Sequence, residues 1–219
     1  MEINREEIKA IAWKQIGESG AAALSLRAIA REMDLTASAL YRYFASRDEL
    51  VTALISGAHT SLSASLITAR DEHAQSDTAR RIRAMCQAYT HWAAANPQRY
   101  LLVFSAPIPG YRIGAEAGHA ADRSFLVLLW VIREAEESGS LRPGLVGGEL
   151  QGRLGEQLAA FQERERSGSP RATYLALAAW SLLHGVTSLL VSGQYSLLLG
   201  ERGEDFVERE IEKIVSWIA

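Results

Sequence analysis

Apolar residues recur at helical spacing along nearly the whole chain. In the first segment, Ile8, Ala12 and Ile16 follow one another every fourth residue and so share one face of a helix. No segment alternates apolar and polar residues between hairpin turns, as a half-buried strand would. The pattern therefore predicts an all-α protein.

Glycine, proline and capping residues divide this pattern into about ten helices. The approximate bounds that we expect are 4–18, 26–33, 37–44, 50–73, 77–96, 97–104, 122–138, 148–166, 169–192 and 203–218. The long helix that starts near residue 50 should join an N-terminal head to the rest of the chain. We therefore expect a functional division into residues 1–49 and residues 50–219, without a flexible linker.

Two short predicted helices near the N-terminus are joined by a tight turn at Asp34 and Leu35. Ser25 stands where an N-cap is needed, and Leu26, Ile29 and Met33 follow at helical spacing. With the helix at 4–18 packed beneath, these elements predict a three-helix head with a helix-turn-helix, a motif whose second helix can enter the major groove of DNA.

The run from Leu24 to Leu50 closely resembles the DNA-binding signature of TetR-type transcriptional regulators, in register over almost 30 residues. The resemblance implies that Arg27 reaches a guanine edge and that residues 36–38 face the bases. It also implies that Tyr41, Tyr43 and Arg47 hold phosphates. The candidate DNA-binding residues are Ser25, Arg27, Thr36, Ala37, Ser38, Tyr41, Arg42, Tyr43 and Arg47.

Two residues depart from the family pattern. Asp34 stands where the family usually has glycine, and aspartate tolerates the left-handed backbone that such a turn requires. Tyr43 stands where histidine is common. The alternative interpretation is that Tyr41 and Tyr43 are packing aromatics, and that Arg27 and Arg42 belong to a solvated helix face.

The C-terminal part carries Trp180, His184 and Gly185, an arrangement similar to the C-terminal domain of one TetR subgroup. The first two residues lie four apart and should share a helical face, while the glycine lets another helix approach closely. In that family the last two helices of one subunit pack against the same two helices of the other subunit across a two-fold axis. The resemblance therefore implies a homodimer, which fits the apolar residues of 182–190 and those of 206–218.

Aromatic residues gather in the middle of the sequence, where TetR-like proteins keep an effector pocket. The candidate ligand-binding residues are Tyr89, Trp92, Phe104, Tyr111, Phe125 and Trp130. Pockets for small molecules are mostly apolar with a few polar groups. The alternative is that these aromatics form only core, in a DNA-binding regulator without an effector.

Composition and charge qualify this picture only slightly. The chain has 219 residues, 48% of them hydrophobic and 22% charged, which is typical of a soluble globular protein. No apolar run reaches the roughly 20 residues of a membrane span and the N-terminus lacks a signal-peptide pattern, so we expect a cytoplasmic protein without a membrane partner. The net charge of −3 is not that of a generally basic nucleic-acid binder, but four arginines and only two acidic residues lie within 27–47.

The sequence shows few side-chain patterns that indicate catalysis, metal binding or disulfides. Cys86 is the only cysteine, which excludes an internal disulfide and predicts a buried thiol. The five histidines show no metal-binding spacing, and neither a nucleophile elbow nor a phosphate loop is present. We therefore expect no catalytic residues, metal or cofactor, with an all-α enzyme as a remote alternative.

The predicted function is a repressor that leaves a palindromic operator when an effector binds. Activation of transcription is the alternative to repression.

Overall fold

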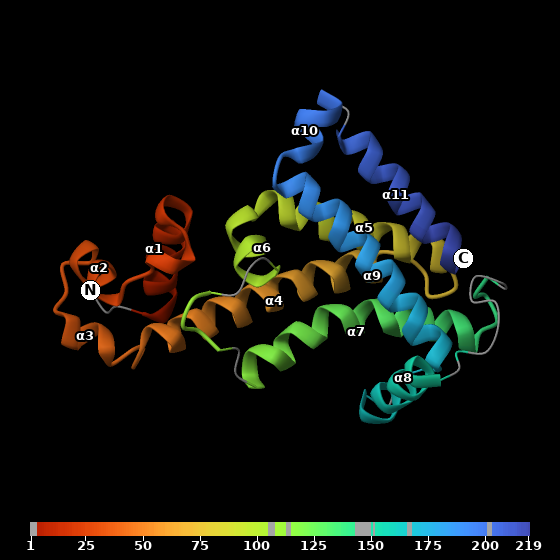
Figure 1. Ribbon diagram of the computed structural model, residues 1–219, viewed down its shortest axis with the longest axis horizontal. Helices are drawn as coiled ribbons and strands as arrows, with labels where there is room; N and C mark the ends of the chain where they lie inside the picture. The colour runs from red at the N-terminus through yellow and green to blue at the C-terminus, as the bar shows by residue number, and fades with distance from the viewer. Residues whose placement is uncertain are drawn as a thin grey trace. The chain divides into compact units, whose positions relative to one another are not determined.

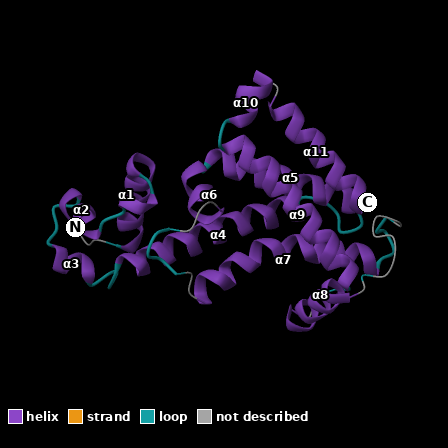
Figure 2. Cartoon of the chain, in the orientation of Figure 1, coloured by secondary structure: helices purple, strands orange, loops and turns teal. Residues whose placement is uncertain are grey.

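Every regular element that the structure describes is a helix. The computed structural model describes residues 4–104, 108–112, 115–142, 150, 152–165, 168–200 and 203–219, with side chains from residue 123 onward in the range 115–142. Within these residues the prediction of an all-α protein is confirmed (Figures 1 and 2). The elements are α1 Arg5–Ser19, the 3₁₀ helix η1 Ala21–Ala23, α2 Leu26–Glu32, α3 Ala37–Tyr41, α4 Arg47–Asp71, α5 Thr78–Ala95, α6 Pro97–Phe104, α7 Ala115–Glu137, α8 Gly152–Glu165, α9 Pro170–Val191, α10 Gln194–Leu199 and α11 Gly203–Ile218.

The helices begin at residues whose side chains satisfy the first backbone amides. Asn4 forms a capping box with Glu7: its Oδ1 accepts from the Glu7 amide at 2.9 Å, and the Glu7 carboxylate accepts from the Asn4 amide at 3.3 Å. Ser169 caps α9 through a hydrogen bond from the Ala172 amide. These caps explain why the starts of the helices follow from the local sequence.

Several helix bounds differ from the expectation, and one helix was not expected. α3 ends at Tyr41, three residues early, and α7 begins at Ala115 because a run rich in alanine extends the helix ahead of Asp122. A separate helix, α10, occupies the predicted connection between α9 and α11. It follows Gly193, whose φ of 73° breaks the helical path after α9. The predicted bounds of α8 at residues 148 and 166 lie outside the described residues.

The chain forms two compact units. Unit 1 comprises Met1–Ser61 and Asn96–Ala121, and unit 2 comprises Leu62–Ala95 and Asp122–Ala219. The helix α4 contributes residues to both. Unit 1 is thus larger than the three-helix head, and the division of labour at residues 49 and 50 stays a prediction.

The core of unit 1 lies beneath the helix-turn-helix. Ile8 of α1, Leu40 of α3 and Phe44 are completely buried together with Leu50 and Leu54 of α4. Apolar residues after α6 also join this cluster, which explains why the segment 96–121 belongs with the N-terminal helices. The core holds α2 and α3 in place from behind and leaves their other faces to solvent.

The core of unit 2 is built from α5, α9 and α11, with α11 packed against both other helices (Figure 1). Ile211, Ile214 and Ile218 of α11 are completely buried there. These three side chains therefore pack inside one chain, and the homodimer through the helices at 169–192 and 203–218 stays a prediction that depends on other residues. Cys86 is buried in the same core, as predicted, and burial raises the pKa of its thiol to about 12.

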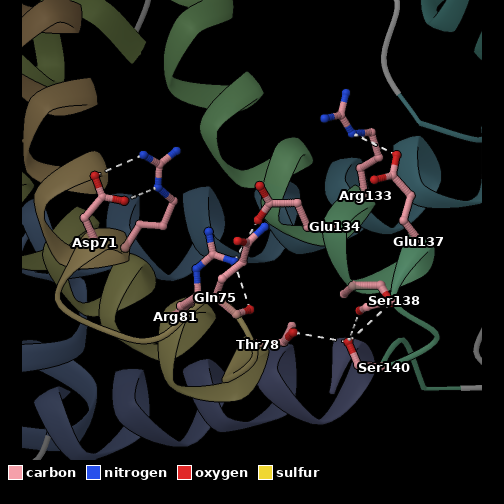
Figure 3. Close-up of polar contacts among 11 residues, drawn as sticks. Asp71, Gln75, Thr78, Arg81, Arg133, Glu134, Glu137, Ser138 and Ser140 are labelled. Atoms are coloured by element: carbon pink, nitrogen blue, oxygen red, sulfur yellow. Dashed lines mark hydrogen bonds and ion pairs between the residues drawn. The ribbon is translucent and has the colours of Figure 1, made fainter.

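Polar contacts also connect the helices of unit 2 (Figure 3). The buried guanidinium of Arg81 on α5 pairs with the Glu134 carboxylate of α7 at 2.7 Å and donates to the Gln75 carbonyl. A buried charge is tolerated only with such partners. On the facing surface of α5, Arg83 binds both carboxylate oxygens of Glu212 on α11, and this hydrogen bonding lowers the pKa of Glu212.

Two helices, α4 and α9, are long and apolar enough to cross a membrane by length and composition alone. Core helices of water-soluble proteins pass the same test. Half of the most apolar window of α4 is buried, but only 33% of that of α9. The outer face of α9 therefore presents apolar surface that the core of unit 2 does not cover.

Candidate nucleic-acid interface

The turn between α2 and α3 is built as a helix-turn-helix requires. Ser25 caps α2 by accepting a hydrogen bond from the Ala28 amide, and the Leu35 amide donates to the Ala30 carbonyl at 2.8 Å. Asp34 has a φ of 54° and is the only non-glycine residue with positive φ in the part of the chain that the structure describes. The prediction that aspartate adopts the left-handed conformation here is confirmed.

The recognition helix α3 is short and is held by its own cap. Thr36 Oγ1 accepts a hydrogen bond from the Ala39 amide at 3.3 Å and lies 3.0 Å from Ser38 Oγ. Both hydroxyl groups are on exposed residues, while Leu40 anchors the opposite face in the core. The start of α3 therefore presents short polar side chains outward, as the sequence resemblance implies.

Several candidate residues line one hollow of about 430 Å³ on this surface. Its lining includes Ser25 and Arg27 of the α2 start, Tyr41 of α3 and Arg47 of α4. Arg27 and Arg42 are exposed, and Tyr41 is 43% exposed. Guanidinium groups and a phenol on one open surface are the donors that phosphate oxygens and guanine edges accept from.

Besides the capping residues Ser25 and Thr36, the candidates Arg47 and Tyr43 also have structural contacts. Arg47 donates through Nε to the Leu24 carbonyl at 3.1 Å and through Nη2 to the Ala21 and Ala22 carbonyls at 2.9 and 3.3 Å. Tyr43 is half-buried against the core of unit 1. The alternative interpretation as a packing aromatic is thus favoured for Tyr43 over Tyr41, and the phosphate role of Arg47 stays a prediction beside its structural role.

The sequence interpretation missed one residue that positions the motif. Arg5 of α1 donates through Nη1 to the Tyr43 carbonyl at 2.8 Å and through Nη2 to the Glu49 carboxylate at 3.1 Å. Its guanidinium also lies 4.1 Å from the centre of the Phe44 ring. These partners are separated from Arg5 by about 40 residues, so no local pattern signals them.

The six candidate ligand-binding aromatics are divided between the units. Phe104 and Tyr111 belong to unit 1, and the other four belong to unit 2. In unit 2, Tyr89 and Trp92 are buried, whereas Trp130 is 42% exposed. The six candidates thus belong to two separate units, and their ligand-binding role stays a prediction.

A smaller aromatic group does form in unit 2. The Tyr89 hydroxyl lies 2.7 Å from His184 Nδ1, and the Trp180 ring packs edge-on against His184 with centroids 4.7 Å apart. Phe125 packs against Trp180 at 5.9 Å. Trp180 and His184 share a helical face as predicted, and they join two of the candidate aromatics into one cluster.

The described residues include no group of three or more histidine, cysteine, aspartate or glutamate side chains arranged to hold a metal ion. Histidine and carboxylate side chains engage instead in ring contacts and ion pairs, as His184 and Glu134 illustrate.

Two protein families match the chain. Residues 8–54 match the bacterial regulatory proteins of the tetR family, and residues 82–214 match the tetracyclin repressor-like C-terminal domain. The first match contains the candidate interface, and the second contains the aromatic cluster of unit 2.

Relatives and solved structures agree with these matches. The HTH-type transcriptional regulators Mb1846 of Mycobacterium bovis and Rv1816 of Mycobacterium tuberculosis are each 34% identical, over 87% of this chain and 83% of the relative. The regulatory protein SCO4313 is 34% identical with a TM-score of 0.80, over 97% of this chain and 95% of that structure. A tetR-family regulatory protein from Rhodococcus RHA1, 18% identical, shares the fold with a TM-score of 0.66 over 100% and 98% of the two chains.

Proposed function

The chain belongs to the TetR family of bacterial regulatory proteins and is a DNA-binding transcriptional regulator, and from this premise we propose that it is a homodimeric repressor that releases a palindromic operator when a small-molecule effector binds. The family and the relatives are regulators of transcription, so the enzyme alternative is set aside. We place its action in the cytoplasm, on double-stranded operator DNA and without a membrane partner.

The observation that carries the DNA-binding part is the exposed polar surface over α2, the turn and α3. Arg27 is the longest donor at the base-facing entry, whereas Thr36 and Ser38 are short. We assign Arg27 to a guanine edge and Tyr41 to a phosphate, with Arg42 in a supporting position. In this division residues 1–49 read DNA, and residues 50–219 dimerise and bind the effector.

Selection of bound sequences from random DNA tests this assignment. We expect a palindrome, since a two-fold symmetric dimer presents the same head to each half-site. Selected sites without two-fold symmetry would contradict the dimeric arrangement, and an absence of any selected sequence would contradict specific recognition.

The outer face of α9 supports a dimer through α9 and α11, the two helices that the sequence predicted as the last two. Tyr174 and Leu177 are 36% and 42% exposed, and Gly185 on the same helix is exposed with open space around it. A small residue in such a face lets a partner helix approach closely. Phe206 of α11 adds a further exposed aromatic ring.

Replacing Gly185 with leucine tests the dimer because the new side chain would occupy the space that a partner helix needs. Sedimentation at micromolar concentration should show a dimeric wild type and a variant with weakened association. Gly57→Leu is a matched control, since Gly57 is also an exposed helical glycine with open space around it. A monomeric wild type, or equal weakening by both substitutions, would rule out this interface.

For the effector, the aromatic cluster of unit 2 is the supporting observation. Tyr89 and Trp180 contact the polar His184, and Phe125 packs against Trp180, so the cluster combines apolar surface with a hydrogen-bonding group. A ligand lowers DNA affinity only if it binds the non-operator conformation more tightly. Ligands found by thermal shift should therefore reduce operator binding, measured by fluorescence anisotropy.

The burial of Tyr89 and Trp92 favours one alternative, a regulator without an effector in which these rings are only core. A small-molecule library that produces no thermal shift, while operator binding remains intact, would favour that alternative.

A further inference from the structure

A stripe of polar side chains runs along one face of α4. Thr52, Ser56, His59 and Ser63 follow one another at intervals of four, three and four residues, which places them on the same side of the helix. His59 and Ser63 are buried, so this is not the solvated face of the helix.

The two ends of the stripe are paired, and its middle is not. In unit 1 the Thr52 hydroxyl lies 3.0 Å from the Tyr111 hydroxyl, and in unit 2 the Ser63 hydroxyl lies 3.0 Å from that of Ser124. Between them, Ser56 Oγ and His59 Nδ1 are buried without a hydrogen-bond partner among the residues that the structure describes.

Unpaired buried polar atoms are unfavourable, and native proteins keep few of them. Two on the same face, one helical turn apart, are therefore unusual. His59 is only 4% exposed, and its ring meets the edge of Phe104 with centroids 5.5 Å apart. Burial lowers the pKa of His59 to about 4, so the imidazole is neutral at pH 7 and one ring nitrogen accepts while the other donates.

We propose that Ser56 and His59 form the polar end of a binding site in unit 1 for a neutral, mainly apolar small molecule that carries a hydroxyl or carboxamide group. Such a group both donates and accepts, which matches a serine hydroxyl beside a neutral imidazole. The Phe104 ring supplies an apolar contact for the body of the ligand. A carboxylate is disfavoured because a buried charge needs an opposite charge, and the Ser56 hydroxyl, the neutral His59 imidazole and the Phe104 ring supply none.

This inference rests on the proposed ligand-responsive function and deepens it. It assigns polar effector contacts to α4, outside the aromatic cluster around His184. Because α4 begins at Arg47, immediately after the helix-turn-helix, a ligand held at Ser56 and His59 would contact the helix that carries the DNA-binding head.

The first test is stability without ligand. Replacing both unpaired groups in Ser56→Ala/His59→Phe removes the unfavourable burial, so the melting temperature should stay equal or rise by about 2 °C. Thr52→Val is the matched control on the same stripe: it leaves the Tyr111 hydroxyl without its partner and should lower the melting temperature. A double variant clearly less stable than the wild type would overturn the proposal, because the two groups would then be paired.

The second test follows the ring nitrogens of His59 directly. Protein labelled with ¹⁵N-histidine is titrated with benzyl alcohol, benzamide, benzoate and toluene, and the His59 signals are assigned by their loss in His59→Phe. Benzyl alcohol and benzamide should shift the His59 nitrogens and bind at least tenfold more tightly than benzoate at pH 7.5. The double variant should lose at least tenfold in affinity for the first two probes while its affinity for toluene stays unchanged. His59 signals that ignore all four probes, or a preference for benzoate, would overturn the proposal.

Operator binding separates this inference from the proposed function. Without ligand, Ser56→Ala/His59→Phe should bind selected DNA as the wild type does. If the wild type binds the probes at His59 but they leave DNA affinity unchanged, the effector function fails and the site remains. If DNA affinity responds to ligands that leave His59 unchanged, the function remains and this site is wrong.

Discussion

The helix-turn-helix and the aromatic residues of the middle sequence are both predicted as sites. In the structure, the first set lies on one local surface, whereas the second set is distributed over two units. Arg27 and Tyr41 lie on the same hollow as Ser25 and Arg47, all within the continuous segment 25–47. The six aromatics, from Tyr89 to Trp130, divide between two units and range from buried to exposed.

The difference has a physical cause. Over two short helices and one turn, the helical period and the caps decide which side chains face outward. A pocket is assembled from distant segments, so an aromatic residue has no local signal that separates lining from core. A site in one local motif can therefore be predicted from sequence, whereas a site built by packing needs the structure.

The largest effect should come from truncating the core behind the DNA-binding surface. Phe44 is completely buried in unit 1, so Phe44→Ala should cost about 3 to 5 kcal/mol of folding free energy. Urea denaturation measures the loss, and hydrogen exchange should place it in unit 1 with operator binding abolished. Phe206→Ala removes the same side chain from an exposed position and should cost well under half as much. Equal losses would show that the distinction between core and surface is wrong at these positions.

The next largest effect concerns the stability of the two units in mild acid, which should decrease first in unit 1. Because the pKa of His59 is lowered to about 4, the unfolded chain binds its proton more readily between that value and 6.5. Stability is therefore complete above pH 6.5 and decreases as the pH falls towards 4, by up to about 3 kcal/mol. Urea denaturation at several pH values should show this slope, and His59→Phe should remove it.

The carboxylates of unit 2 respond in a different range. Hydrogen bonds from Arg70 and Arg83 lower the pKa values of Asp71 and Glu212, so their contributions are lost only at pH values below the ordinary carboxyl range. Hydrogen exchange at pH 5 should therefore show weakening first in unit 1. A pH dependence that is equal in wild type and His59→Phe would contradict the assignment to His59.

A smaller effect is expected at the DNA surface itself. Arg27→Ala should relax the preference at one symmetric base pair of each half-site, with a loss of about 1 to 3 kcal/mol in discrimination. Binding-site selection scored position by position measures this change. Arg42→Ala is the control on the same face and should leave that base preference intact. A uniform loss of affinity in Arg27→Ala would instead make Arg27 a phosphate contact.

The smallest predicted effect concerns the two roles of Arg47. Removing its hydrogen bonds to the Leu24 and Ala21 carbonyls should cost about 1 to 2 kcal/mol of stability in Arg47→Ala. If the side chain also binds DNA, the salt dependence of affinity should fall by roughly one phosphate per subunit, for operator and random DNA alike. Salt titrations well below the melting temperature separate the two effects, and an unchanged salt dependence would leave Arg47 with the structural role alone.

The sequence by itself determined the helical class, most helix starts and the helix-turn-helix, including the left-handed turn at Asp34. These features depend on interactions within a few residues: an N-cap such as Asn4 or Ser25 bonds to an amide three residues away, and helical periodicity repeats over one or two turns. The main resemblance to TetR regulators rested on the same contiguous segment, and the match of residues 8–54 to the tetR family confirms it.

Only the tertiary structure decided which side chains meet across long separations. It placed Arg5 against Tyr43 and Glu49, and it buried Ile211, Ile214 and Ile218 of α11 inside unit 2. It also paired Thr52 and left Ser56 Oγ and His59 Nδ1 without a partner among the described residues, although all three residues lie on one face of α4. Periodicity tells which residues share a face, but the partner of that face is set by packing among distant helices, and the local sequence does not encode that partner.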